Sequence, residues 1–311
     1  MGAPRSTPAA RPCTFGAPMT DAQRTFFRRF ASTAILWTVA LWTIFTGSEP
    51  GFVLLVSGLG LVGLWEYYTM LDAKKLPNFK MFGMVCGALM LGGSFYWLAW
   101  ARRTPDGLYD FEIGALLFFM LVVFGRQMFL KVQELVPLET MAFTLFGIFY
   151  VAWPFSFVAK IVYMIPRDAA GQVAGHWYVL FLVLVTKFSD MGAYLTGSLI
   201  GKHPLVPHIS PKKTWEGLFG ALAFSIGGGC ALVALLGEKL AFISYGHAVV
   251  LGLVLGFAAV VGDLAESLIK RSCGVKDSGR FLPGIGGALD LIDSILFTAP
   301  MMFFYLRFVL R

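Results

Sequence analysis

Residues 262–294 read GDLAESLIKRSCGVKDSGRFLPGIGGALDLIDS and join two long apolar stretches, 243–265 and 285–308. In a chain otherwise saturated with apolar residues, this segment gathers acidic, basic and glycine residues at the ends of both stretches. Ionisable groups at or inside the edge of a bilayer are rare, costly and usually functional. The segment therefore predicts a membrane-spanning fold with a functional site near the membrane surface. Its carboxylates, ammonium groups and glycines indicate metal-assisted phosphate chemistry.

The composition is typical of an integral membrane protein. Of the 311 residues, 57% are hydrophobic and 14% are charged, whereas soluble domains carry roughly 25% charged residues. The formal net charge is +7, but the basic residues lie in short loops between apolar stretches, which disfavours nucleic-acid binding. The four cysteines show no C-x-x-C spacing, which disfavours a disulfide framework and a zinc site. We therefore expect an all-α, polytopic membrane protein.

Hydropathy predicts about nine transmembrane helices, because a hydrocarbon core about 30 Å thick requires roughly 20 apolar residues per helix. Eight helices are the alternative, because the first predicted span is short and Arg126 interrupts the fourth. The predicted spans are residues 31–47, 51–70, 81–101, 112–130, 140–165, 176–200, 217–236, 243–265 and 285–308.

The chain divides into three expected parts, namely a disordered cytoplasmic tail (1–30), N-terminal transmembrane helices (31–170) and a C-terminal transmembrane catalytic region (171–311). Lys and Arg residues on the two sides of the spans stand at about 17 to 6, with the excess on the side of the N-terminus. We therefore expect the N-terminus and the charged loops to face the cytoplasm, where soluble nucleotides are available. The lack of a transit-like or endoplasmic-reticulum signal favours a bacterial inner membrane.

The end of the sixth predicted span carries the first group of candidate site residues. Asp190, Ala193 and Gly197 recur at i, i+3 and i+7, so one helical face combines a carboxylate with small residues that let another helix approach. Asp190 is therefore a candidate for a shared interior site.

The loop that follows is a candidate anion site. Ser210, Lys212, Lys213 and Thr214 supply two hydroxyl groups and two cations just before a helix begins, where free backbone N–H groups favour anions. The alternative is a positive-inside loop with an N-capped helix, in which Thr214 is the cap and Glu216 enters the first turn.

The second group begins in the eighth predicted span. Asp263, Ser267 and Lys270 recur at i, i+4 and i+7, which aligns a carboxylate, a hydroxyl and an ammonium group along one helical face. Glu266 and Lys270 are spaced as an i,i+4 ion pair in the favourable orientation, which is a structural interpretation of Glu266.

Acidic residues also follow the glycine-rich stretch 283–287, which leads into a helix N-terminus where an anion can dock. Asp290 and Asp293, at i and i+3, lie on one face of that helix and are candidate ligands for a divalent cation such as magnesium. The alternative is that they form salt bridges with Lys276 or Arg280.

Several other chemistries lack their motifs in this chain. No HExxH spacing, no Gly-x-Ser-x-Gly elbow and no GxxxxGK[ST] phosphate loop is present. The sequence therefore disfavours zinc proteases, serine hydrolases of that kind and Walker-type nucleotidases.

The C-terminal half resembles the phosphatidate cytidylyltransferases, also called CDP-diacylglycerol synthases. Their signature is similar to Ser267-Leu-Ile-Lys270-Arg271-x4-Lys276-Asp277-Ser278-Gly279-x2-Leu282-Pro283-Gly284-x-Gly286-Gly287-x2-Asp290-x2-Asp293. A second hallmark is similar to Ser210-Pro-Lys-Lys-Thr-Trp-Glu-Gly217, and a third to Asp190 followed by Ala193-Tyr194. Glu66-Tyr67-Tyr68 is a weaker similarity, and the rest of the N-terminal half resembles the family only as hydrophobic helices.

This resemblance implies transfer of CMP from CTP to phosphatidic acid at the membrane, with release of pyrophosphate. It implies that Asp263 and Asp290 bind Mg²⁺, with a monovalent cation such as K⁺ between them. A second copy of the chain is a further expected partner. We assign catalysis to Asp263, Lys270, Asp290 and Asp293, and substrate or phosphate binding to Asp190, Ser210, Lys212, Lys213, Thr214, Ser267, Arg271, Lys276, Asp277, Gly286 and Gly287.

The chain departs from the family signature at two positions. Ile285 stands where the family usually has His between the glycines, and Leu291 stands where it usually has Arg after the aspartate. These changes remove a phosphate donor or proton-transfer group and a cation. They keep two alternatives open: a cytidylyltransferase for another lipid phosphate and a catalytically silent homologue. A third alternative, a lipid or anion transporter, rests on the intramembrane charges of the chain.

Overall fold

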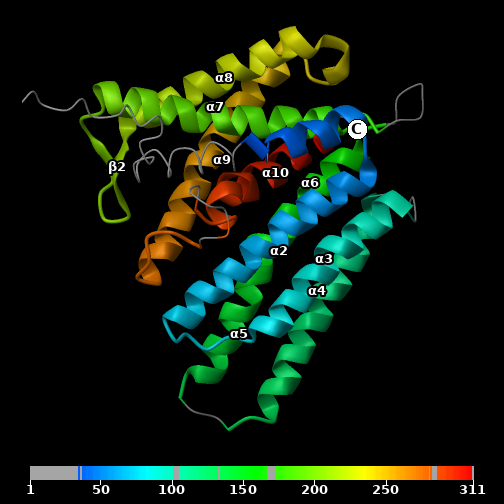
Figure 1. Ribbon diagram of the computed structural model, residues 1–311, viewed down its shortest axis with the longest axis vertical. Helices are drawn as coiled ribbons and strands as arrows, with labels where there is room; N and C mark the ends of the chain where they lie inside the picture. Colours follow the sequence, from blue (N-terminus) through cyan, green and yellow to red (C-terminus); the bar gives the residue numbers. More distant parts are fainter. Residues whose placement is uncertain are drawn as a thin grey trace, which may run out of the picture.

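The computed structural model describes residues 34–35, 37–100, 105–131, 134–166, 173–279, 281 and 286–309, and these residues are mainly helical (Figure 1). The expected tail, 1–30, lies outside the described residues, as does Ile285. The helices are α2 (Glu49–Ala73), α3 (Lys80–Phe95), α4 (Pro105–Met128), α5 (Val136–Gly147), α6 (Trp153–Met164), α7 (His176–Ile200), α8 (Trp215–Leu236), α9 (Tyr245–Ser272) and α10 (Leu289–Val309). The short elements are the π-helical turns η1 (Tyr96–Trp100) and η2 (Ile148–Ala152), the 3₁₀ turn η3 (Gly237–Leu240), and the strands β1 (Pro204–Val206) and β2 (Ser210–Thr214).

The described residues contain eight helical segments long and apolar enough to cross a membrane, so the all-α, polytopic fold is confirmed. Two of these segments include a π-helical turn. Lys80–Trp100 joins α3 to η1, and Val136–Met164 joins α5 to α6 through η2. The first predicted span, 31–47, contains only a shorter apolar helix, Trp37–Thr46, in the described part of the chain. At 1.5 Å per residue that helix is about 15 Å long, half of a hydrocarbon core. The alternative of eight spans therefore fits the described residues.

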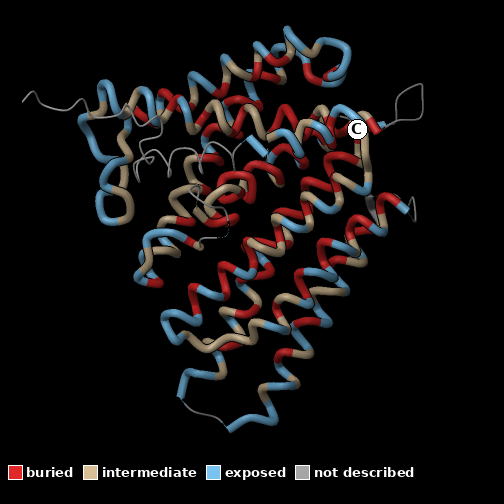
Figure 2. Tube along the Cα trace, viewed as in Figure 1, coloured by how far each residue is buried: buried red, intermediate tan, exposed pale blue. Residues whose placement is uncertain are grey.

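Burial differs between the spans. The α5–α6 span is the most buried and α4 is the least, so the apolar side chains of α4 lie mostly on the outside (Figure 2). An outward apolar face is stable in lipid because acyl chains are as apolar as these side chains. In the interior, α10 packs against α2, α6, α7 and α9, so the charged start of α10 lies among helices from both halves of the chain.

Helices α7 and α8 run side by side (Figure 1) and approach closely through small residues. A Cβ atom added at Gly192 would lie 2.5 Å from the carbonyl oxygen of Gly220, and one at Gly217 would lie 3.0 Å from that of Ala193. Gly197 faces the Cα of Gly217. The expectation that this face of the sixth predicted span receives a neighbouring helix is therefore confirmed.

Between α7 and α8 the chain forms a short antiparallel hairpin, in which Pro204 pairs with Thr214 and Val206 with Ser210. Thr214 then caps α8, because its hydroxyl oxygen accepts a hydrogen bond from Gly217 N–H at 3.1 Å. Glu216 accepts hydrogen bonds from the backbone N–H groups of Lys202 and His203, which ties the hairpin to the start of α8. The N-cap interpretation of this loop is confirmed, and the hairpin fixes the direction of its lysines.

A buried ion pair connects two spans of the N-terminal half. Lys160 Nζ on α6 lies 2.7 Å from Glu112 Oε2 on α4, and both side chains are almost fully buried. Trp153 Nε1 and the Ser94 hydroxyl also donate hydrogen bonds to the Glu112 carboxylate. Because the Glu112 carboxylate has several donors and the Lys160 ammonium also lies 3.6 Å from the Phe157 ring centroid, the pair can remain buried inside an apolar bundle.

Candidate functional site

A cavity of about 490 Å³ lies where the hairpin and helices α7, α8, α9 and α10 meet. It is lined by side chains from both predicted groups, so predicted residues as far apart as Asp190 and Asp293 share one site. The predicted site residues that line it are Asp190, Ser210, Lys212, Lys213, Thr214, Asp263, Lys270, Asp290 and Asp293. The cavity also contains Lys187 and Glu266, which the sequence did not assign to a catalytic or binding role.

Three carboxylates in this cavity are placed to hold a cation together. One oxygen atom each from Asp263, Glu266 and Asp293 lies within 4.8 Å of the other two. Asp263 and Glu266 are adjacent on α9 because they are three residues apart, and Asp293 approaches from the first turns of α10. Glu266 Oε1 is buried and accepts no hydrogen bond within the described structure. A set of hard oxygen donors with an unsatisfied buried oxygen fits Mg²⁺.

Asp290, which was predicted to bind metal with Asp263, has other partners in the structure. Its Oδ1 accepts a hydrogen bond from Lys270 Nζ at 2.8 Å, and its Oδ2 accepts one from Gly287 N–H at 2.8 Å. The backbone N–H of Ser278 lies 3.4 Å from both oxygens. A carboxylate in the first turn of a helix that accepts from the preceding N–H groups stabilises the helix start. Asp290 therefore holds Ser278 and Gly287 beside the start of α10.

The predicted i,i+4 pair on α9 forms, because Lys270 Nζ lies 2.5 Å from Glu266 Oε2. The structural interpretation of Glu266 is incomplete, since its carboxylate also belongs to the cluster with Asp263 and Asp293, and its Oε1 has no hydrogen-bond partner in the described structure. Asp290 pairs with Lys270. The sequence suggested Lys276 or Arg280 as its partner, and Arg280 lies outside the described residues. Lys270 thus joins the metal-ligand candidates to the loop that precedes α10.

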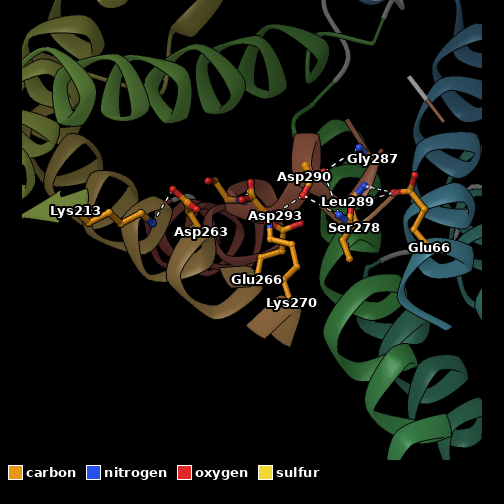
Figure 3. Close-up of polar contacts among 11 residues, drawn as sticks. Glu66, Lys213, Asp263, Glu266, Lys270, Ser278, Gly287, Leu289, Asp290 and Asp293 are labelled. Carbon is orange, nitrogen blue, oxygen red and sulfur yellow. Dashed lines mark hydrogen bonds and ion pairs between the residues drawn. The ribbon is translucent and has the colours of Figure 1, made fainter. Parts of the chain in front are cut away.

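Two further lysines reach the cavity from its other walls. Lys213 Nζ on β2 lies 2.7 Å from Asp263 Oδ2, so the hairpin places a cation next to one member of the carboxylate cluster (Figure 3). Lys187 Nζ lies 3.0 Å from Asp190 Oδ2, one turn away on α7. The cavity therefore combines paired cations and carboxylates that can exchange partners when a phosphate and a metal ion bind.

Glu66 on α2 contributes to the site from the other half of the chain. Its Oε2 accepts hydrogen bonds from Leu289 N–H at 2.9 Å and from the Ser278 hydroxyl at 3.4 Å, and the residue is only 4% exposed (Figure 3). Cβ atoms added at Gly279 and Gly287 would lie 2.1 and 2.5 Å from its carboxylate oxygens. Glycine is therefore required at both positions for the backbone to lie against the Glu66 carboxylate.

Sequence reasoning assigned no role to Glu66, although a carboxylate inside an apolar span is a signal of function or of a buried partner.

The remaining predicted site residues lie outside the lining of the cavity. Gly286, with φ of 125°, and Gly287 form the entry to α10 beside Asp290. Within the described residues, Ser267, Arg271, Lys276 and Asp277 are absent from the lining, and the last three are exposed.

Comparison with known proteins finds relatives over most of the chain. A phosphatidate cytidylyltransferase from Mycobacterium leprae (strain TN) is 35% identical over 221 residues, which cover 68% of this chain and 67% of that protein. The phosphatidate cytidylyltransferase of Brucella suis biovar 1 (strain 1330) is 30% identical over 279 residues, or 89% and 92% of the two chains. That of Bacillus subtilis (strain 168) is 29% identical over 281 residues, or 90% and 97%. The model of the cytidylyltransferase family matches residues 27–309, and the chain therefore belongs to that family.

Proposed function

We propose that this protein is a phosphatidate cytidylyltransferase, which transfers CMP from CTP to phosphatidic acid and forms CDP-diacylglycerol and pyrophosphate. The observation that carries the proposal is a single cavity between membrane-spanning helices that combines three clustered carboxylates with four lysines. Carboxylates hold the cation that accompanies a nucleoside triphosphate, and lysines offset phosphate charge. The named relatives support the choice of CTP and phosphatidate as substrates.

In the proposed reaction, a phosphate oxygen of phosphatidate attacks the α-phosphorus of CTP. The bond between the α-phosphorus and the oxygen that bridges to the β-phosphate breaks, and pyrophosphate leaves with that oxygen. Asp263, Glu266 and Asp293 would hold the magnesium ion, which supplies polarisation of the phosphoryl group when bound. Lys213 and Lys270 are positioned to bind phosphate oxygens. Lys213 would give up its ion pair with Asp263 in doing so, whereas Lys270 would stay held by Asp290.

The metal assignment refines the expectation from the sequence. The clustered oxygens favour Asp263, Glu266 and Asp293 as the first ligands, whereas Asp290 has its oxygens engaged by Lys270 and Gly287. We propose that Asp290 acts from beside the ion, by fixing Lys270 and the loop. A monovalent cation such as K⁺ and a homodimer stay predictions.

The protein is an integral membrane protein, and we propose that the cavity faces the cytoplasm of a bacterial inner membrane. The excess of Lys and Arg on one side of the spans supports this orientation. It would give a soluble nucleotide access to the cavity from water and a lipid access from the adjacent leaflet.

The test is CDP-lipid formation by purified protein from labelled CTP and phosphatidate, with Mg²⁺ or with EDTA. We expect Mg²⁺-dependent product and one pyrophosphate per CDP-lipid. Asp263→Asn should lower the rate by about 100-fold or more, since a metal ligand is lost, whereas Glu238→Gln, at an exposed position, should not.

Product from polyprenyl or ether-lipid phosphates but not from phosphatidate would assign the enzyme to another lipid. CTP binding without product from any lipid phosphate would identify a silent homologue. Lipid or anion transport without pyrophosphate release would identify a transporter. Any of these three results would overturn the proposal.

A further inference from the structure

A second cavity, of about 330 Å³, lies beside the polar one, and we propose that it receives an acyl chain of the lipid substrate while Lys187 marks the boundary with the phosphate. This inference rests on the proposed function, because it assumes a lipid phosphate as the acceptor. The cavity is bounded by the short helix Trp37–Thr46 and by α2, α6, α7 and α10. Its size is at the lower end of the range for ligand pockets, which fits one chain better than a whole diacyl lipid.

The lining of this cavity is unsuited to a polar ligand. Apart from Thr43, Lys187 and the indole of Trp37, the described side chains that line it are aliphatic or phenyl groups. The hydroxyl of Thr43 donates to the carbonyl oxygen of Ala40 at 2.8 Å, so this donor is already used. An unbranched hydrocarbon chain loses no hydrogen bonds in such a site, whereas a sugar, base or phosphate would lose several.

The two cavities meet at one residue of α7. Lys187 lines both of them. Towards the C-terminus of α7, Asp190 and Tyr194 follow it at i+3 and i+7 and line the polar cavity. Towards the N-terminus, Val183 and Leu180 precede it at i−4 and i−7 and line the apolar one. One helical face therefore changes from polar to apolar at Lys187.

Helix α10 repeats this division. Asp290, Asp293 and Ser294 line the polar cavity, whereas Ile292 and Ile295 line the apolar one. Leu291, which replaces the Arg of the family signature, also lines the apolar cavity. The position that the sequence marked as a lost cation is therefore part of an apolar wall.

The position of Lys187 along α7 explains why an acyl chain would enter the protein. Lys187 is near the middle of α7, roughly 17 Å along the axis from either end. Its Nζ atom lies 3.0 Å from Asp190 Oδ2, so the ammonium group points into the polar cavity. A lipid phosphate bound there would have its first acyl carbons at the level of the apolar cavity, among helices.

The cavity would select chains by shape more than by affinity. An acyl chain in the bilayer is already in hydrocarbon, so its transfer into an apolar pocket changes the hydrophobic free energy little. A side chain that fills the pocket should therefore impair long-chain substrates through steric exclusion. Substrates with chains too short to enter the pocket should be affected much less.

Adjacent residues of α2 provide a matched pair of variants. Leu55 lines the cavity, whereas Leu54 is 76% exposed on the outside of the same helix. For Leu55→Trp we expect the ratio of kcat/KM for dioleoyl phosphatidate to that for dihexanoyl phosphatidate to fall by about tenfold, the usual order for overpacking an apolar site. Leu54→Trp should leave the ratio unchanged. If Leu55→Trp does not fold, Val183→Ala replaces it. The enlarged cavity should then raise the ratio of kcat/KM for a branched-chain phosphatidate to that for dihexanoyl phosphatidate.

Lipid photolabelling tests the same inference without turnover. Phosphatidate with a diazirine on its acyl chain, incorporated into vesicles without CTP, should label the segment of α7 that contains Val183. Leu55→Trp should reduce this labelling and Leu54→Trp should not. Absence of CDP-lipid from every phosphatidate would reject the proposed function. An active wild-type protein, with equal ratios and equal labelling in the two variants, would reject only the acyl-chain cavity.

Discussion

Lys270 lies between two carboxylates, with its Nζ atom 2.5 Å from Glu266 Oε2 and 2.8 Å from Asp290 Oδ1. The first carboxylate belongs to the candidate metal cluster, and the second holds the loop that enters α10. One ammonium group therefore connects the proposed metal ligands to the glycine-rich loop. Its loss should affect both chemistry and the order of the loop.

Replacing this cation should be costly. In Lys270→Met we expect kcat/KM for CTP to fall by about 100-fold or more, the order found when a charge-stabilising group is removed from an active site. Steady-state kinetics in detergent micelles measure this. Lys75→Met, at an exposed position, is the control, and equal activities of the two variants would contradict the role of Lys270.

The metal assignment separates Asp293 from Asp290. If Asp263, Glu266 and Asp293 are the first ligands, Asp293→Asn should raise the Mg²⁺ concentration for half-maximal activity by about tenfold or more, since a hard anionic oxygen is lost. Asp290→Asn should change this concentration less, and should lower the melting temperature because the partly buried ion pair with Lys270 is lost. Mn²⁺ binding followed by electron paramagnetic resonance provides a readout without turnover. The reverse pattern would restore Asp290 as the metal ligand.

Glu66 should act by positioning. Glu66→Ala leaves Leu289 N–H buried without its acceptor, at a cost of about 1–3 kcal/mol. We expect a lower melting temperature and a kcat reduced more than KM changes, because the loop next to Asp290 loses its support. Glu66→Gln keeps an acceptor oxygen and should recover part of both properties, whereas Glu238→Ala should match the wild type. A fully active Glu66→Ala variant would show that the loop holds without this contact.

The orientation can be tested with single cysteines at opposite ends of α8. His208→Cys lies in the turn of the hairpin and Glu238→Cys in η3, and both positions are exposed. A membrane-impermeant maleimide should label His208→Cys in inside-out vesicles and Glu238→Cys in right-side-out vesicles. The opposite pattern would place the cavity on the outer face.

Unwanted labelling of the native Cys273 should be low in this experiment, because this residue lies after α9 and is buried. Burial raises the pKa of its thiol, although Lys74 acts in the opposite direction. A raised pKa leaves less thiolate near neutral pH, so Cys273 should react slowly and faster as the pH rises. Cys13→Ser and Cys230→Ser remove two other thiols from the parent chain.

The spans and most of the site could be predicted from the sequence because hydropathy and helical spacing are local properties. Asp190, Lys213 and Asp263 were identified in this way, and they line one cavity. The hairpin was not predicted, because its second strand, SPKKT, lacks the alternation of a half-buried strand. The short helix Trp37–Thr46 is likewise apolar, and only its length separates it from a span.

The remaining features depend on contacts between distant segments. Glu66 accepts a hydrogen bond from Leu289, 223 residues away, and no periodicity in the sequence records that contact. The sequence predicted the pair of Lys270 with Glu266 from their i,i+4 spacing, but not the second pair with Asp290, which is 20 residues away. For the same reason Leu291 was interpreted as a missing cation, whereas its neighbours in space are apolar.

The buried pair of Glu112 and Lys160 has a consequence for biogenesis. Each residue lies in an apolar span, where an unpaired charge costs up to about 3 kcal/mol during insertion into the bilayer. The partners are 48 residues apart, so Glu112 leaves the ribosome before Lys160 does. We therefore expect α4 to be retained at the translocon until α6 has been inserted beside it, and the two helices to enter the lipid together.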